Sequence, residues 1–489
     1  MKVWSPQQEA IFDRFATPTP RNFAARARAG TGKTTVIIEG VKRAPDKSIQ
    51  LCAFNKSIEK ELSLRIVGFS HVKAKTLHGT GCGIVMRNWS GIQIESDNRR
   101  GTRAKDITEA VTGGRVPDAA KALITKLHGK SREIFPHADS AGDLINLMYD
   151  FDILPDEYLE DMGYTPEVIE DFALKAMEFA ASKKPVEMDF SDMIFLPCRN
   201  RWIRPGPNLV VVDEAQDMSP AQLEIAMGLA RDRIVVVGDD RQAIYGFRGI
   251  DSNTFNKLIK TIDADVLPLT ITYRCPQSVV RLAQLLVPDY EACETNPEGI
   301  VRNLHKEKLV EEAQENDFIL SRLNAPLVSV AISLLKSGKR ARVAGRDIGA
   351  GLKALIRKFK AKSIPDFLSK LSTWEERQMK RMQKAGREDK IGEIVDKADM
   401  LRTLFEEAPN MQFVDDRIDA LFSDQEGRGV IMCSSVHKAK GLETQRVFTL
   451  DETFKSKFGA TIEEDNIRYV AITRAQAELI RVVETKEWQ

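Results

Sequence analysis

Two short runs of apolar residues each end abruptly in acidic residues. The first lies within LVVVDEAQD, residues Leu209–Asp217, and the second within IVVVGDDRQAIYGFRG, residues Ile234–Gly249. Continuous apolar runs of this length are typical of strands buried on both faces of a parallel sheet. The helical pattern of residues 220–230 between them predicts a βαβ unit. The two acidic ends are therefore expected side by side at the ligand-binding edge of the sheet.

Other apolar stretches extend this alternation along the chain. In the first half, further strands are expected at Phe23–Ala27, at Ile49–Phe54, up to Thr76-Leu77-His78, and at Val266–Thr272. A second set is expected at Phe318–Ser321, Ala341–Ala344, Val430–Ser434, Arg446–Leu450 and Leu479–Val483. Within 83–187, and again within 360–425, apolar residues recur at helical spacing instead.

The sequence therefore predicts an α/β fold with parallel sheets in two domains. The first domain would comprise residues 1–82 and 188–274, with 83–187 as a helical insertion. The second would comprise residues 275–359 and 426–489, with 360–425 as a small, charge-rich helical insertion. A chain of 489 residues is too long for one hydrophobic core, which agrees with this division.

A glycine-rich turn indicates what the acidic edge would hold. The segment Ala29-Gly30-Thr31-Gly32-Lys33-Thr34-Thr35 lies between the first strand and an amphipathic helix expected at Thr34–Val41. Its glycines let backbone N–H groups surround phosphate oxygens, Lys33 would reach the terminal phosphates, and the Thr34 hydroxyl would bind Mg²⁺. Asp213 would complete the metal site through water, and Glu214 would polarise the attacking water. We therefore predict a protein that binds and hydrolyses a nucleoside triphosphate.

Composition adds limits rather than a function. The 43% hydrophobic and 29% charged residues are ordinary for a soluble protein, and a net charge of +1 neither requires nor excludes nucleic acid. The six cysteines are scattered without zinc-ligand spacing, so we expect reduced thiols inside a cell. Because no signal-peptide layout and no membrane-length apolar run occur, we expect a soluble intracellular protein, cytoplasmic if the cell is bacterial.

Taken in order, the motifs resemble those of superfamily 1 DNA helicases of the UvrD/Rep/PcrA group, over almost the whole chain. The family's A-x-x-G-x-G-K-T matches residues 27–34, which accounts for Ala27 where a general phosphate loop has glycine. DEAQD matches 213–217, G-D-x-x-Q-x-I-Y matches 238–245, T-x-H-x-x-K-G-L-E matches 435–443, and Y-V-A-x-T-R-A matches 469–475. The segment Phe54-Asn55-Lys56 is similar to the F-box DNA helicase branch. The resemblance implies two RecA-like P-loop NTPase domains.

The resemblance also implies roles at the nucleotide. Gln8 and Tyr273 would contact adenine, Gln242 and the arginines Arg274 and Arg474 would reach the γ-phosphate, and Glu443 would lie in the nucleotide cleft. Gln216 would link the nucleotide to the DNA side. The implied ATP-binding residues are Gln8, Ala29, Gly30, Thr31, Gly32, Lys33, Thr34, Thr35, Gln242, Tyr273, Arg274, Gly441, Glu443 and Arg474. The residues expected to act in catalysis are Lys33, Asp213, Glu214, Gln242, Arg274 and Arg474.

For single-stranded DNA, the matched positions are Phe54, Asn55, Lys56, His78, Tyr245, Phe247, Arg248, His437 and Lys438. Phe247, between Gly246 and Arg248, fits a platform on which a base stacks, with a core aromatic as the alternative. His78 fits a structural histidine equally well.

The resulting hypothesis is an ATP- and Mg²⁺-dependent helicase that moves 3′ to 5′ on single-stranded DNA and unwinds duplex. Its expected partners are single-stranded DNA, single-strand/duplex junctions and proteins of a replication or repair assembly, without a membrane. The alternative is an ATP-driven motor subunit or remodeller of protein–DNA complexes that does not unwind alone. A small-molecule phosphotransferase using the same loop is a third reading, which ATP turnover indifferent to DNA would favour.

Overall fold

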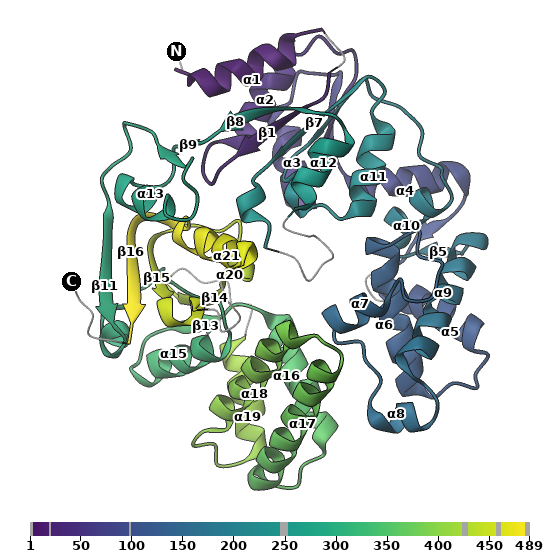
Figure 1. Ribbon diagram of the computed structural model, residues 1–489, viewed down its shortest axis with the longest axis vertical. Coiled ribbons are helices and arrows are strands. Elements are labelled where there is room, and N and C mark those ends of the chain that lie inside the picture. The colour runs from purple at the N-terminus through teal and green to yellow at the C-terminus, as the bar shows by residue number, and fades with distance from the viewer. Residues whose placement is uncertain are drawn as a thin grey trace. The chain divides into compact units, whose positions relative to one another are not determined.

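The computed structural model describes residues 3–18, 21–96, 99–244, 253–422, 429–455 and 461–484 (Figure 1). Contacts divide the chain into two compact units. The first unit comprises residues 1–28 and 32–269, and the second comprises 29–31 and 270–489. Each unit contains its own six-stranded sheet, and the strands of both sheets pair in parallel. The α/β fold with two parallel sheets is thus confirmed.

The sheet of the first unit has the order β3-β2-β6-β7-β1-β8. Its strands are β1 (Phe23–Ala27), β2 (Ile49–Ala53), β3 (Val72–Thr76), β6 (Leu209–Val212), β7 (Arg233–Gly238) and β8 (Asp265–Leu269). Strands β6 and β7 pair directly, with Val211 opposite Val235. The two apolar runs that end in acidic residues are therefore neighbours, as their pattern predicts.

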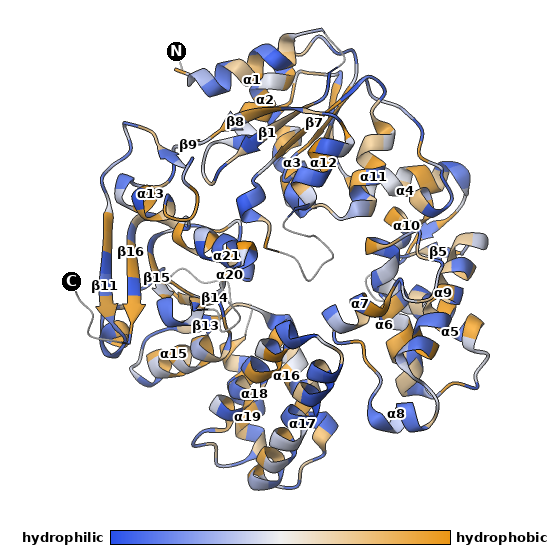
Figure 2. Cartoon of the chain, in the orientation of Figure 1, coloured by the Kyte–Doolittle hydropathy of each residue, from blue (hydrophilic) through white to orange (hydrophobic). Residues whose placement is uncertain are grey.

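Strand β7 shows why these runs are continuously apolar. Val235 and Val237 lie in the core on one face of the sheet, packed with helix α2 (Lys33–Arg43), while Val236 lies in the core on the other face with α11 (Pro220–Leu229). A strand covered on both faces gains from an apolar side chain at every position. Figure 2 shows this concentration of hydrophobic residues on β7.

Helices cover the first sheet and build the insertion that follows it. Besides α2 and α11, the helices are α1 (Pro6–Ala16), α3 (Lys56–Arg65), α4 (Leu77–Asn88), α5 (Thr102–Thr112), α6 (Asp118–Ile134), α7 (Ile145–Asp150), α8 (Glu157–Asp161), α9 (Pro166–Ser182), α10 (Asp192–Arg199) and α12 (Thr254–Thr261). Helices α5, α6 and α9 share an apolar core of their own with parts of α4 and α10. The helical insertion is thus attached to the α/β part through α4 and α10.

The sheet of the second unit has the order β11-β16-β15-β12-β14-β13. Its strands are β11 (Ile300–His305), β12 (Phe318–Ser321), β13 (Ala341–Val343), β14 (Ile431–Ser435), β15 (Thr444–Leu450) and β16 (Ala475–Val483). Its helices are α13 (Gln277–Ala283), α14 (Leu309–Glu312), α15 (Ala325–Lys336), α16 (Arg346–Phe359), α17 (Ile364–Lys384), α18 (Ile391–Phe405), α19 (Met411–Leu421), α20 (Val436–Ala439) and α21 (Ile462–Ile472). The long helix α17 is largely hydrophilic (Figure 2).

Several local expectations were wrong. The strand expected to end at His78 stops at Thr76, whose side chain accepts the Gly79 N–H and caps α4. Residues expected to form one strand at 266–272 form β8 and the short β9 (Ile271–Thr272), which pairs with β10 (Glu291–Ala292). The insertion contains a strand pair, β4 (Gln93–Ile94) with β5 (Glu187–Met188). Edge strand β11 was missed because only one of its residues is fully buried and its sequence carries no continuous apolar signal.

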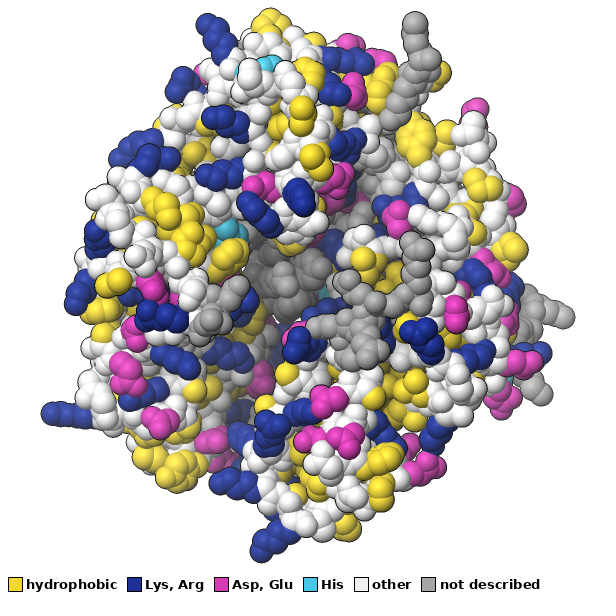
Figure 3. Space-filling model, turned by 180° about the vertical axis from the view of Figure 1, so that it is seen from behind, with side chains coloured by type: hydrophobic (Ala, Val, Ile, Leu, Met, Phe, Trp, Pro, Cys, Tyr) yellow, Lys and Arg dark blue, Asp and Glu magenta, His cyan; other side chains and the backbone are white. Residues whose placement is uncertain are grey.

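The surface is mixed in charge. On the face shown in Figure 3, Lys and Arg side chains are interspersed with Asp and Glu, in keeping with 72 basic and 71 acidic residues. The six cysteines are all free thiols. Within the described part of the chain, none of the helices has the length and apolar character needed to cross a bilayer. Because the basic and acidic residues nearly balance, binding of a charged ligand must depend on local groups and not on the net charge.

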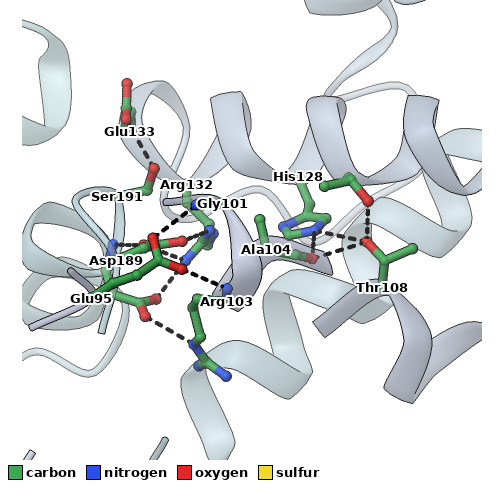
Figure 4. A network of polar contacts seen from close by, with 12 residues as sticks. Glu95, Gly101, Arg103, Ala104, Thr108, His128, Arg132, Glu133, Asp189 and Ser191 are labelled. Carbon is green, nitrogen blue, oxygen red and sulfur yellow. Dashed lines mark hydrogen bonds and ion pairs between the residues drawn. The ribbon is translucent and has the colours of Figure 1, made fainter. Parts of the chain in front are cut away.

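A buried polar network joins α5 and α6 to the segment before α10 (Figure 4). The network includes the buried His128, whose Nε2 lies 3.1 Å from both the Thr108 hydroxyl and the Ala104 carbonyl oxygen. Burial, reinforced by the charge of Arg132, lowers the pKa of His128 to about 3. The histidine is therefore neutral in the folded protein at neutral and mildly acidic pH.

Acidification below pH 6 is expected to destabilise the protein through His128. In the unfolded chain this histidine has a pKa near its ordinary value of 6.5, so the unfolded chain takes up a proton first. The stability that neutral His128 provides is complete above pH 6.5 and is lost progressively as the pH falls toward 3. The expected loss is about 1 kcal/mol per pH unit from this group. Urea unfolding of wild type and His128→Gln at pH 7.5, 6 and 5 measures it, and equal slopes in both proteins would contradict it.

Candidate nucleotide and nucleic-acid sites

The glycine-rich turn lies between β1 and α2, where the sequence places it. Gly30 and Gly32 have φ angles of +71° and +80°, which side-chain-bearing residues rarely adopt. Gly32 is also the residue before α2, so the helix begins at Lys33 directly after the turn. The free N–H groups of a helix N-terminus attract anions. This geometry suits a phosphate group at the end of β1.

Lys33 lies against the acidic end of β6. Its Nζ donates to Glu214 Oε2 at 2.7 Å, and both side chains are mostly buried. Burial alone would lower the pKa of Lys33, but the charges of Glu214, Asp239 and Asp213 outweigh it and raise the pKa. The lysine is therefore fully charged and held in place beside the turn.

Asp213 and Thr34 provide oxygen atoms next to this lysine. The Thr34 hydroxyl donates to Asp213 Oδ2 at 3.3 Å, and Asp213 is 4% exposed. Burial and the neighbouring charge of Glu214 raise the pKa of Asp213 to about 7. Two crowded carboxylates beside a hydroxyl form a hard oxygen site where a cation would relieve the repulsion, which fits Mg²⁺.

Glu214 and Gln216 connect the ends of β6 and β7. Glu214 has the left-handed backbone conformation, with φ 51° and ψ 42°, which is uncommon for a residue with a side chain. The Gln216 amide donates to Glu214 Oε2 at 2.7 Å and its oxygen accepts the Asp239 N–H at 3.1 Å. Asp239 in turn accepts from the Gln242 amide at 2.6 Å. The two predicted glutamines thus share one hydrogen-bonded chain with Glu214.

Sequence reasoning missed Arg28, the buried partner of Asp239 in this series of hydrogen bonds. Its Nη1 donates to Asp239 at 3.3 Å and to Asp240 at 2.7 Å, and Arg28 is 5% exposed. The signal was present, because Asp239 and Asp240 are the acidic residues that follow the second apolar run. Their basic partner could not be found from the sequence, since it is 211 residues away from Asp239.

Gln8 is placed at the beginning of α1. Its Oε1 accepts the Ser5 N–H at 3.0 Å while the Ser5 hydroxyl accepts the Gln8 N–H, which forms a reciprocal helix cap. This contact gives Gln8 a structural role as well as the predicted one at adenine. Thr35, also predicted for the nucleotide, accepts a hydrogen bond from Arg65 Nη2 at 3.1 Å.

Four predicted DNA contacts of the first unit line one groove of about 670 Å³. They are Phe54, Asn55, Lys56 and His78. Asn55 caps α3 through the Ile58 N–H at 2.9 Å, and Lys56 is 84% exposed in its side chain. The groove is therefore bordered by an exposed cation and by aromatic rings, as a nucleic-acid site would be.

Phe190 is a further groove residue that sequence reasoning did not single out. Its ring stacks on His78 with centroids 3.8 Å apart and planes at 19°. Phe190 is 57% exposed, which is unusual for phenylalanine, and lies between Asp189 and Ser191. An isolated aromatic among polar residues was the available signal. Burial lowers the pKa of His78 to about 4, so the stacked histidine is neutral near pH 7.

In the second unit, Arg274 and Glu443 form an ion pair, with Nε and Oε2 2.5 Å apart. The Arg474 guanidinium is buried, donating from Nε to the Val470 carbonyl at 2.9 Å and from Nη1 to the Leu442 carbonyl at 3.2 Å. Burial and the nearby charge of Arg274 lower the pKa of Arg474. Two close guanidinium groups form an electropositive site that an anion would stabilise.

Other predicted residues of this unit lie around the same elements. Tyr273 is 45% exposed, and Gly441, in the turn that follows α20, has a φ of +84°. Lys438 Nζ binds both carboxylate oxygens of Asp347 at 2.8 Å, and His437 lies beside it on α20. Tyr245, Phe247 and Arg248 lie outside the described residues. The roles predicted for all of these side chains stay predictions.

Residues 29–31, which form part of the glycine-rich turn, belong to the second unit. The Ala29 N–H donates to the Tyr469 hydroxyl oxygen at 2.9 Å, and the Tyr290 hydroxyl donates to the Ala29 carbonyl at 3.0 Å. The two tyrosine rings meet edge to face. Tyr469 belongs to the predicted Y-V-A-x-T-R-A motif, so this motif contacts the turn through a residue that sequence reasoning did not list.

Comparison with known proteins gives two family matches that overlap by a short stretch. Residues 6–263 match the UvrD/REP helicase N-terminal domain, and residues 249–485 match the UvrD-like helicase C-terminal domain. Together the two matches span nearly the whole chain.

Individual relatives are more distant. The chain is 24% identical to F-box DNA helicase protein 1 of Schizosaccharomyces pombe, over 93% of this chain and 55% of that protein. It is 37% identical to RecBCD enzyme subunit RecB of Mycobacterium tuberculosis, over 19% of this chain and 8% of that one. It is 33% identical to ATP-dependent DNA helicase Rep of Escherichia coli, over 20% of this chain and 16% of that protein. The chain thus spans about half the length of the first of these relatives, and the matches to the other two are short.

Proposed function

Because the chain belongs to the UvrD-like helicase family, we propose that it is a DNA-dependent ATPase that moves 3′ to 5′ on single-stranded DNA and separates duplex strands. One observation carries the proposal. The charged Lys33, the oxygen-rich cation site of Thr34 and Asp213, and the candidate base Glu214 belong to the same unit as a groove lined by aromatic and basic side chains. A DNA substrate places the protein inside the cell.

The residues of the first unit divide the chemistry of ATP hydrolysis among them. Lys33 and the N-terminal end of α2 bind the phosphates, and Thr34 and Asp213 would hold Mg²⁺. Mg²⁺, when bound, neutralises charge on the phosphate oxygens. Glu214 orients a water molecule and takes its proton. Gln216 donates a hydrogen bond to the Glu214 carboxylate and accepts one from the Asp239 N–H, so it couples the position of Glu214 to that of Asp239.

The second unit supplies positive charge for the transferring phosphoryl group. Arg274 and Arg474 repel each other, which favours an anion between or beside them. An arginine at the transferring phosphoryl group is worth about 10³–10⁵ in rate.

The groove of the first unit binds the strand in this proposal. Phe190, supported by the neutral ring of His78, offers an exposed face on which a base stacks, worth about 1–3 kcal/mol per base. Lys56 and the N-terminal end of α3 meet the sugar–phosphate backbone. Stacking reads no sequence, as a motor that moves along any strand requires.

Steady-state ATP hydrolysis with and without a single-stranded oligonucleotide tests the proposal. We expect strong stimulation by the DNA strand, and unwinding of a duplex with a 3′ tail but not of one with a 5′ tail. Turnover that ignores DNA would contradict the proposal and favour a phosphotransferase. Unwinding from the 5′ tail would overturn the polarity alone.

Replacing Lys56 by glutamine is expected to weaken strand binding and make it less sensitive to salt. Removing one phosphate contact should reduce the slope of log K against log salt concentration by about 1, because one fewer counterion is released. Fluorescence anisotropy of a labelled oligonucleotide at several salt concentrations measures this slope. Lys42→Gln is the matched control, since Lys42 also pairs with a glutamate three residues away on a surface helix. An equal change of slope in both variants would exclude a specific contact at Lys56.

A second function is favoured by the match to a RecBCD enzyme subunit, a protein named as part of a complex. In this alternative the chain is a DNA-bound motor subunit, or a remodeller of protein–DNA complexes in replication or repair, that does not unwind alone. It predicts ATP turnover stimulated by single-stranded DNA together with no strand separation from either tail. The tailed-duplex assay therefore distinguishes the two functions.

A further inference from the structure

The segment that carries Phe190 is fixed on both sides by buried polar contacts. Arg132 of α6 donates to both carboxylate oxygens of Asp189, from Nη2 at 2.6 Å and from Nη1 at 3.1 Å. Nη1 also donates to Asp192 at 2.5 Å, and Arg103 Nε donates to the other oxygen of Asp192 at 3.0 Å. Figure 4 shows Arg132, Asp189 and Arg103 of this network.

Phe190 is the exception within this segment. Asp189 and Asp192 are buried, and the Ser191 hydroxyl donates to Glu133 of α6 at 2.9 Å. Asp189 also accepts the Asp192 N–H at 2.8 Å, which begins α10. Only the Phe190 side chain points out of this tethered turn, where its ring is 57% exposed and stacks on His78. The contacts therefore fix the backbone on either side of one exposed ring.

The chemistry of the network favours orientation over stability. Arg132 and Asp192 are fully buried, and removing such charges from water costs about as much as their attraction returns. The buried atoms Arg132 Nε and Arg103 Nη2 have no hydrogen-bond partner within the described part of the chain, which adds to the cost. An apolar cluster would join α6 to α10 as firmly. A two-pronged guanidinium–carboxylate contact instead fixes angles, because both of its hydrogen bonds must be satisfied together.

We propose that Arg132 is a positioning residue, which through Asp189 and Asp192 fixes the 189–192 turn so that Phe190 stacks on His78 and faces the groove. Helix α6 also contributes Lys130, Glu133 and Ile134 to the lining of that groove. The helical insertion thus sets the geometry of a ring that it does not itself carry. The use of that ring in gripping a strand rests on the proposed function, whereas the placement of the ring does not.

The placement is tested without DNA by the NMR signals of the six histidines in protein labelled at histidine. The Phe190 ring shifts the His78 ring signals upfield, and Phe190→Ala identifies them by removing this shift. We expect Arg132→Lys, which keeps the charge but loses the two-pronged contact, to remove most of the same shift. An unchanged His78 signal in Arg132→Lys would overturn the proposal. Asp189→Asn, which weakens the same contact from the other side, provides a second variant with the same expectation.

A double-mutant cycle on binding of a fluorescein-labelled 20-nucleotide oligo(dT) tests the consequence. Phe190→Ala is expected to weaken binding by about 5- to 150-fold, the range for one stacked base. Arg132→Lys should weaken it by about 5-fold or more on its own, and by less than about 2-fold in the Phe190→Ala background. Equal effects in both backgrounds would mean that Arg132 acts on the protein as a whole, and would overturn the proposal.

Arg233→Lys is the matched control for loss of a buried arginine. Arg233 is 4% exposed and makes a two-pronged contact with Asp46 at the beginning of β7, away from the groove-lining residues. We expect it to lower the melting temperature while leaving the His78 signal and oligo(dT) affinity unchanged. Failure of wild type to bind oligo(dT) would contradict the proposed function, and the His78 signals would still decide the role of Arg132.

Discussion

Replacing Glu214 by glutamine is expected to lower ATP turnover by about 10²–10⁴-fold, the usual contribution of a general base. Glutamine has the same shape but cannot accept the proton of the attacking water. Its side-chain oxygen can still accept the hydrogen bond from Lys33 Nζ, so binding of ATP should persist. The left-handed backbone at Glu214 is unaffected by this change, which keeps the end of β6 intact.

Turnover of Glu214→Gln is measured at saturating ATP and DNA, and ATP binding is measured separately with a fluorescent ATP analogue. Glu39→Gln is the control, because Glu39 also pairs with a lysine but lies partly exposed on α2. We expect the control to match wild type. A loss of less than about 10-fold in Glu214→Gln would show that another group accepts the proton.

Replacing Arg474 by lysine is expected to reduce turnover by about 10³–10⁵-fold, the effect of losing an arginine at the transferring phosphoryl group. Lysine keeps the positive charge but cannot reproduce the planar guanidinium, which here binds two backbone carbonyls at once. The nearby Arg274 would remain, with its Glu443 partner, so some charge at the site is retained. The predicted loss of turnover therefore comes from the changed geometry of the side chain and not from a loss of charge.

Because Arg474 is fully buried, its variant must be separated from simple unfolding. Circular dichroism and the melting temperature report the fold, and ATP-analogue binding reports the site. Arg468→Lys, on helix α21 six residues before Arg474 and partly exposed, is the control and should retain full turnover. A folded Arg474→Lys protein with near-normal turnover would assign the buried arginine to structure alone.

Much of the fold was predictable because its signals are local. Val210, Val211 and Val236 belong to runs without polar interruption, and such runs are stable only between two covering layers. The glycines at 30 and 32 and the lysine after them define a turn whose conformation depends on a few adjacent residues. Edge strand β11 has only one fully buried residue and so shows no such run.

The candidate site was predictable to the same extent. Lys33, Thr34, Asp213 and Glu214 follow apolar strands, and parallel strands bring their carboxyl ends to one edge whatever the length of chain between them. The hydrogen bonds from Gln216 to Glu214 and Asp239 needed coordinates, because they depend on side-chain directions at that edge. Phe190 was overlooked because a single aromatic among acidic residues has no periodicity to read.

The sequence by itself determined two parallel α/β sheets, a glycine-rich turn before a helix and the carboxylates at the end of β6, since each depends on backbone preferences and burial within a short stretch. Only the tertiary structure decided that Arg28 pairs with Asp239 and that Arg132 pairs with Asp189, 57 residues further along the chain. Such pairs depend on how helices and strands pack in space. No local pattern encodes that packing, because any buried arginine could satisfy any buried carboxylate that the fold brings near it.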